Sequence, residues 1–179
     1  MIKGIRIETQ VPPMLIFCLA EQVEYNCTGT NDVYYSDMGD LSPTETLTAQ
    51  SQMAVGTNAS AGFVITALGA PLSAGTTTIP SLLTPTQSNP GVNQFGINLV
   101  ANSNPGIGLD PEGVWANATT APDYGQADRY KFIDGDIVAS SPNVSLMKKF
   151  TVSYIVNVSP SLKAGVYTTT INFVASGRF

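Results

Sequence analysis

The chain contains no histidine, few charged residues and no long apolar run. Without imidazole, a Ser-His-Asp or Cys-His catalytic arrangement and a histidine-based metal site are excluded. The GxSxG, P-loop and GxGxxG motifs are absent as well. We therefore expect that the protein is not an enzyme and that it uses no cofactor.

The scarcity of basic residues argues against a nucleic-acid partner. The net charge is −5, and the only adjacent basic pair is Lys148-Lys149, so no basic stripe can neutralise phosphates. No apolar run approaches the roughly 20 residues that a membrane helix needs, so we expect no membrane span. No signal peptide is visible, and we expect the chain to be a mature or trimmed form.

Glycine, proline, serine, threonine and asparagine are abundant, and this composition suits short strands joined by turns. A length of 179 residues predicts one domain, residues 1–179. A chain of this length buries about 70% of its unfolded surface, so it needs no metal or disulfide to fold.

Apolar periodicity predicts about ten short strands and no helix. The segment at residues 47–57 is expected to form a hairpin with 63–69. Asp134-Gly135 favours a type I′ turn between two further strands. The pattern predicts an all-β fold: an antiparallel β-sandwich of Ig-like or jelly-roll Greek-key type with long loops. The expected strands and short hairpins cover residues 2–11, 14–20, 33–41, 47–57, 63–69, 72–79, 94–100, 130–138, 150–158 and 166–175.

The first predicted strand has a special position. Its alternating pattern indicates a half-buried strand, and Pro12-Pro13 separates it from the next apolar run. Such a terminal strand pairs either with its own sheet or with the sheet of a neighbouring molecule. In the second case residues 1–12 act as a donor strand, and the side chains expected in the acceptor are Ile2, Ile5, Ile7, Thr9 and Val11.

Cys18 and Cys27 are separated by a short segment. They are either two buried thiols or a disulfide that clamps a hairpin, and the short separation favours the disulfide. A disulfide predicts a location outside the cytosol, which here means extracellular or cell-surface. Five Asn-X-Ser/Thr sequons, a modest excess over chance, agree with that setting and make glycans a candidate modification at Asn26, Asn58, Asn117, Asn143 and Asn157.

Two pairs of acidic residues and one acidic cluster are candidates for a catalytic carboxylate pair or a calcium site. A glycosidase needs two carboxylates that flank the sugar, but aspartate is also favoured in turns for its local hydrogen bonds. We interpret both pairs as turn residues. The cluster does not match the spacing of an EF-hand calcium loop, so no metal site is predicted. The pairs are Asp110 with Glu112 and Asp134 with Asp136, and the cluster is Asp32, Asp37 and Asp40.

Two loop-like stretches, residues 80–93 and 102–128, contain no clear strand. Trp115 lies in the second. Its indole either stacks on a sugar or a partner or folds back as a plug on the end of the sandwich. We favour the plug.

Several segments of the chain carry recognisable motifs. Residues 11–18 resemble a VPPxLxFC opening, residues 38–43 an LGxLSP turn, and residues 51–63 an xVxTNAxxGY segment. Residues 150–154 and 164–169 are similar to FTVxY and AGxYxTT segments. Together these segments resemble those of a family of secreted bacterial surface proteins. The chain departs from the family at Lys163, where proline is usual, and it lacks the WxL tripeptide.

More loosely, the chain is similar to the β-sandwich subunits of TasA/camelysin-type, WxL-type and spore-coat-U-type surface fibres. The resemblance implies a structural subunit of an extracellular filament, pilus or surface layer. Identical subunits would then be the partners, joined head-to-tail through donor strands. The alternative is a monomeric surface adhesin or carbohydrate-binding module that uses the long loops.

Overall fold

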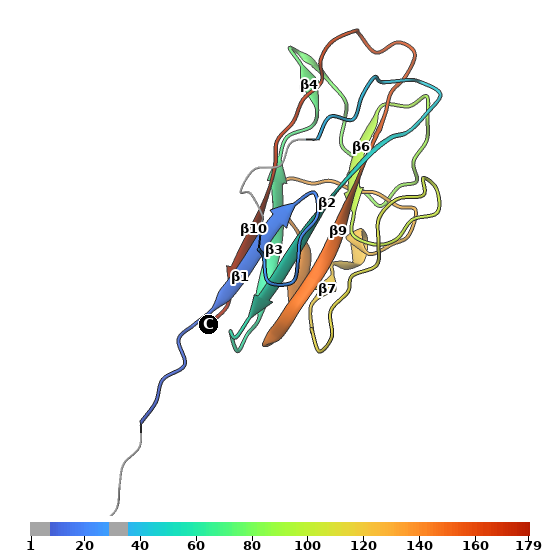
Figure 1. The fold of residues 1–179 in the computed structure, drawn as a ribbon. Helices are drawn as coiled ribbons and strands as arrows, with labels where there is room; N and C mark the ends of the chain where they lie inside the picture. The colour runs from blue at the N-terminus through green and yellow to red at the C-terminus, as the bar shows by residue number, and fades with distance from the viewer. Residues whose placement is uncertain (1–7, 29–35) are drawn as a thin grey trace, which may run out of the picture.

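The computed structural model describes residues 8–28 and 36–179, which form the predicted antiparallel β-sandwich (Figure 1). The first sheet has the order β1-β2-β9-β6 and the second the order β10-β3-β8-β7, and β4 pairs with β5 in a small hairpin. A 3₁₀ turn, η1, spans Pro122–Tyr124. The strands are β1 (Leu15–Ala20), β2 (Leu47–Thr57), β3 (Phe63–Gly69), β4 (Ser73–Ala74), β5 (Thr77–Thr78), β6 (Gln94–Asn98), β7 (Thr119–Thr120), β8 (Asp136–Ser141), β9 (Ser145–Asn157) and β10 (Ile171–Gly177).

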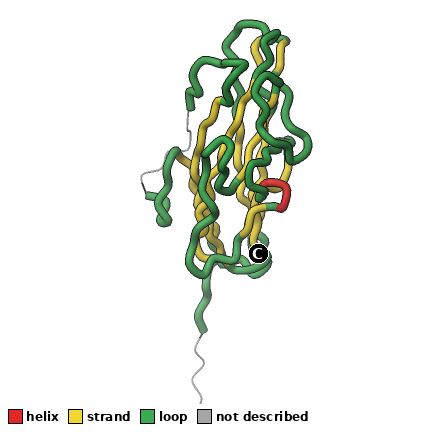
Figure 2. The backbone as a smooth tube through the Cα atoms, turned by 90° about the vertical axis from the view of Figure 1, so that its right-hand side faces the viewer, coloured by secondary structure: helices red, strands yellow, loops and turns green. Residues whose placement is uncertain are grey.

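The main core lies between the two sheets, which form two layers in Figure 2. Alternate side chains point inward along each strand, because successive residues of a strand face opposite sides of its sheet. In β2 the inward residues are Met53 and Val55, and in β3 they are Phe63, Ile65 and Ala67. All five have no exposed surface.

Several predicted strands agree with the structure, but two predicted hairpins are wrong. β2 belongs to the first sheet and β3 to the second, so the turn at residues 58–62 carries the chain across the sandwich. The Asp134-Gly135 turn also carries the chain from one sheet to the other. Lys131, before the turn, pairs with Ile97 of the first sheet, while β8, after the turn, lies in the second. Alternation shows that a strand has a buried face, but it does not show which sheet the strand joins.

Other boundaries also differ from the prediction. Residues 33–35 lie outside the described residues, and 36–41 form no strand. The last strand begins at Ile171 instead of residue 166, although Thr168 makes an isolated bridge to Ser73. The predicted inward face of the segment is correct: Tyr167, Thr169, Ile171, Phe173 and Ala175 are each less exposed than their neighbours in the sequence.

Candidate assembly surface

The N-terminal tail leaves one end of the sandwich and points away from it (Figures 1 and 2). Residues 8–13 belong to no strand and are all exposed, including Val11 at 78%. The predicted donor residues Thr9 and Val11 therefore lie in solvent, and these two do not form a strand in their own sheets. The other predicted donor residues, Ile2, Ile5 and Ile7, lie outside the described residues.

The root of the tail is held by the end of β2. Asn58 accepts a hydrogen bond from the Met14 backbone N–H through its Oδ1 (2.7 Å) and donates one from its Nδ2 to the Pro12 carbonyl (2.7 Å). The Thr57 hydroxyl donates to the Met14 carbonyl (2.7 Å), which also accepts from the Asn58 N–H. These bonds set the direction in which the tail leaves the domain. The sequence marks Asn58 as a sequon and as part of the segment 51–63, and neither signal predicts this role.

The strands β1 and β10 are the edges of the two sheets on the same side of the sandwich, where they approach one another. In the described residues, β10 has β3 as its one strand partner. Inward-facing apolar residues on this side remain partly exposed although they pack against the core: Leu15, Phe17 and Leu19 of β1, and Ile171 and Ala175 of β10. We call this side the open edge.

The opposite side, the closed edge, is covered by other parts of the chain. The backbone of β6 exchanges hydrogen bonds with Pro80 and Leu82 through Phe95, and with Lys131 through Ile97. The apolar side chains there are almost completely buried, and the rings of Phe95 and Phe132 pack edge to face with centroids 5.3 Å apart. At the second sheet, the edge strand β7 is only two residues long, which limits pairing with another chain.

The predicted disulfide is present, with Cys18 and Cys27 joined by an S–S bond. The loop that it closes is not a hairpin of strands but folds over the outer face of the first sheet. Val23 is buried there, and its N–H donates to the Gln52 side chain (3.1 Å). The Lys149 ammonium lies 5.3 Å from the centroid of the Tyr25 ring. The disulfide thus helps to cover β2, which explains why this strand is buried on both faces.

The five sequons lie in different environments. Asn26, Asn117 and Asn143 are exposed, and the last two share a hydrogen bond of 2.9 Å. Asn58 is partly buried and binds Pro12 and Met14 at the root of the tail, a contact that we call the tail clamp. Asn157 is 1% exposed and bonded to Thr46, Ser88 and Gln94, so the folded domain does not present it to solvent. Glycosylation stays a prediction for the exposed sites.

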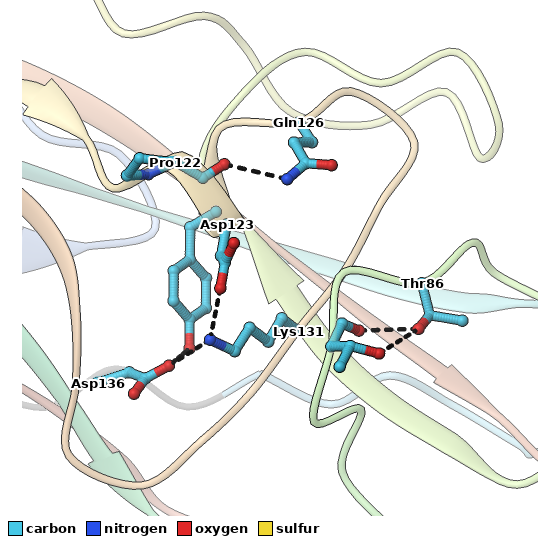
Figure 3. Close-up of polar contacts among 8 residues, drawn as sticks. Thr86, Pro122, Asp123, Gln126, Lys131 and Asp136 are labelled. Atoms are coloured by element: carbon cyan, nitrogen blue, oxygen red, sulfur yellow. Dashed lines mark hydrogen bonds and ion pairs between the residues drawn. The ribbon is translucent and has the colours of Figure 1, made fainter.

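A charged cluster lies at the closed edge, beside the start of β8 in the second sheet (Figure 3). The Lys131 Nζ lies 2.8 Å from a carboxylate oxygen of Asp123 and 2.8 Å from one of Asp136. The Tyr124 hydroxyl donates to the same Asp136 oxygen (2.9 Å). The Lys131 side chain is 11% exposed. The cluster ties η1 and residue 131 to the start of β8, so Asp136 does more than the turn role that the sequence predicts.

The protonation states of this cluster are those of a structural ion pair. Burial lowers the pKa of Lys131, but its hydrogen bonds to Asp123 and Asp136 outweigh that effect, and the net pKa is raised. Burial, followed by the hydrogen bond to Asp136, raises the pKa of Tyr124. The ammonium therefore stays charged and the phenol neutral near pH 7, which is unsuited to a nucleophile or a general base.

Four of the remaining acidic candidates make local contacts, and Asp40 is exposed. Asp134 accepts from the Gly69 N–H (2.9 Å), Asp110 from the Ala101 N–H (3.1 Å), and Asp37 from the Gly39 N–H (2.9 Å). Glu112 forms an ion pair with Lys149. Asp32 lies outside the described residues. Over residues 8–28 and 36–179 no group of three or more histidine, cysteine or acidic side chains is arranged to hold a metal ion.

The prediction that Trp115 plugs the sandwich is wrong. Trp115 is 84% exposed and has a positive φ of 59°. Its loop is held back instead by Glu112, whose backbone pairs with that of Lys149 in β9. The indole lies in solvent, and the preceding residue Val114 is 77% exposed.

No protein-family model matches the chain, and a comparison with curated proteins finds no match. In the part of the chain that the structure describes, no helix has the length and apolar character needed to cross a membrane.

Proposed function

We propose that the protein is a structural, non-enzymatic subunit of an extracellular filament or cell-surface layer. Subunits join head-to-tail by N-terminal donor-strand complementation. The observation that carries this proposal is the exposed tail at residues 8–13, which forms no strand with its own sheets although an open edge exists on the domain.

The physics of strand addition favours such an assembly. An added strand gains main-chain hydrogen bonds for affinity, and its alternate side chains enter apolar sites for specificity. The sequence of the tail alternates over residues 5–11, with Ile5, Ile7, Thr9 and Val11 on one side. A head-to-tail contact uses two different surfaces, so it produces an open polymer instead of a closed dimer.

Two further features support the surface location. The Cys18–Cys27 disulfide is the kind of cross-link that persists in oxidising compartments. The segments similar to secreted surface proteins lie in the body of the sandwich and at the Pro12-Pro13 break. Both features are consistent with a subunit that is exported before it assembles.

The test is polymerisation of the intact chain and of a variant without residues 1–12, observed by negative-stain electron microscopy. The intact protein should form filaments, and the deletion variant should remain a folded monomer with a lower melting temperature. A matched pair isolates the inward face of the tail: Ile5→Lys with Ile7→Lys should abolish assembly, and Arg6→Ser with Gln10→Ser should retain it. An intact chain that stays monomeric at high concentration contradicts the proposal.

A second candidate function is carbohydrate or partner binding by a monomeric adhesin, and the exposed Trp115 favours it. Aromatic rings present a flat apolar face suited to sugar rings. Trp115 is the only tryptophan of the chain, so its fluorescence reports directly on this site. A saturable change in emission with soluble polysaccharides, lost in Trp115→Ala, would support the adhesin, and an unchanged emission would oppose it.

A further inference from the structure

The open edge offers two strands, β1 and β10, as partners for the tail of a second copy. The choice between these two strands rests on the proposed function. The closed edge is excluded because the backbone of β6 already bonds to Pro80, Leu82 and Lys131. The strand β7 has two residues, too few for a stable pairing.

The outer edge of β10 combines a long backbone edge with an incomplete apolar surface. It has seven residues, and within the described chain its strand pairing is limited to β3. Phe173 is buried at 8% exposure, while Ile171 and Ala175 on either side of it are partly exposed. Across the gap between the sheets lie the partly exposed Phe17 and Leu19 of β1. A strand added beside β10 would cover both rows.

The directions of the strands distinguish β10 from β1. Leu15 pairs with Thr57, and Gly177 pairs with Phe63, so β1 begins at the end of the sandwich where β10 finishes. The tail leaves from that same end (Figure 1). In a head-to-tail polymer all subunits point the same way, so the incoming tail runs parallel to β1 of its acceptor and antiparallel to β10. The antiparallel pairing is slightly more stable per residue.

The length and register of the two segments also match. Residues 5–11 are as long as β10, about 23 Å in extended form. The Pro12-Pro13 pair cannot continue a hydrogen-bonded ladder and ends the segment. With Val11 opposite Ile171, Thr9 lies opposite Phe173 and Ile7 opposite Ala175, so each inward residue of the tail meets an inward residue of β10.

We infer that the outer edge of β10 (Ile171–Gly177) is the acceptor site for residues 5–11 of a second copy of this chain. The tail of the second copy enters antiparallel, with Val11 nearest Ile171. It extends the sheet β10-β3-β8-β7 by one strand and covers the partly exposed apolar residues of β1 and β10.

The test uses cysteine pairs in the full-length chain. In the inferred register Gln10 and Asn172 are directly opposed and both face outward, within the Cα separation that a disulfide requires. Filaments of the Gln10→Cys, Asn172→Cys variant, oxidised and run on a non-reducing gel, should give a ladder of covalent multimers. The matched control pairs Arg6→Cys with Ile16→Cys, because these two positions are level with one another if the tail runs parallel along β1, and it should give none. Peptide mass mapping confirms that Cys18 and Cys27 remain joined to each other.

The outcomes separate this inference from the proposed function. A ladder with residue 172 and none with residue 16 supports the β10 site. Wild-type filaments combined with a ladder only through residue 16, or with neither ladder, overturn the β10 site and leave the filament proposal intact. A residue 10 to 172 cross-link within single chains also overturns it, because the tail would then pair with its own domain. If the wild-type chain forms no filaments, the proposed function fails first.

Discussion

The closed and open edges of this sandwich differ in how the chain completes them. At the closed edge, segments around residues 80–82 and 131 bond to β6, and Phe95, Ile97 and Phe132 are at most 2% exposed. At the open edge, β1 and β10 end their sheets with inward-facing apolar residues that remain partly exposed. The chain thus covers one side of the sandwich almost completely, whereas the other side keeps apolar surface that the described residues do not fully cover.

The two sides also use different kinds of reinforcement. The closed edge relies on aromatic packing and on the cluster of Lys131, Asp123 and Asp136. Near the open edge the reinforcement is covalent, because the Cys18–Cys27 loop lies over the outer face of β1 and β2. A covalent link stabilises an edge strand without occupying the backbone groups with which another strand would pair.

The largest expected difference between the edges is the cost of truncating a core aromatic. Phe95→Ala should lower the free energy of unfolding by about 3–5 kcal/mol, because a fully buried ring is lost and a cavity remains. Phe17→Ala should cost about 1–2 kcal/mol in the monomer, because its ring is only partly buried. Urea unfolding of dilute protein measures both values. Equal costs would show that the open edge is packed as completely as the closed one.

The sequence predicted the positions of several strands better than it predicted the sheets that these strands join. The ends of β2 and β3 agree with the predicted segments 47–57 and 63–69 because turn residues bound an apolar run in each case. Their placement in different sheets could not be predicted, since it depends on long-range pairing of β2 with β9 and of β3 with β10. Periodicity is a local property, whereas sheet order is set by contacts between distant segments.

The candidate site shows the same limit. The alternation of the tail, the Pro12-Pro13 break and the disulfide were visible as patterns of neighbouring residues. The Asn58 hydrogen bonds join residues 44 or more positions apart, and the Lys131 cluster joins η1 and residue 131 to the start of β8. Trp115 is exposed in a loop whose Glu112 pairs with Lys149, and this pairing between distant residues is not visible in the local sequence.

Removal of the disulfide tests the reinforcement near the open edge. Replacing Cys18 and Cys27 by alanine should lower the free energy of unfolding by about 2–3 kcal/mol, the value that chain entropy gives for a loop this short. Hydrogen exchange should rise first in β1, because Val23 no longer covers the outer face of its sheet. The measurement is exchange mass spectrometry of the oxidised protein and the variant. Uniform loss of protection, including β6, would remove the distinction between the two sides.

The tail clamp sets the direction in which the tail leaves the domain, so its loss tests how a subunit presents its tail to the open edge of another copy. Asn58→Ala removes the bonds to the Met14 N–H and the Pro12 carbonyl and should cost about 1 kcal/mol of preorganisation. That loss raises the critical concentration for polymerisation about fivefold. Sedimentation of filaments across a concentration series measures it. Asn89→Ala, at an exposed asparagine far from the tail, is the control and should assemble like the wild type.

The smallest effect concerns acid stability of the loops beside the closed edge. The backbone N–H groups of Asn104 and Ser103 donate to Asp128 (2.8 and 2.7 Å) and hold the pKa of that carboxyl below its ordinary value. A lowered folded pKa gives stability that is present above the unfolded pKa of about 4 and is lost as the pH falls through the folded pKa.

Asp128→Asn should therefore lower the melting temperature at pH 7, and the gap to the wild type should narrow at strongly acidic pH. Thermal unfolding of both proteins across a pH series measures this gap, with Asp40→Asn at an exposed site as the control. Because Asp128 fastens the loop that follows β6 and not the open edge, acid should raise hydrogen exchange around residues 103–104 before it affects β10. A gap that does not change with pH would show that the hydrogen-bond geometry, and not the charge of Asp128, holds this loop.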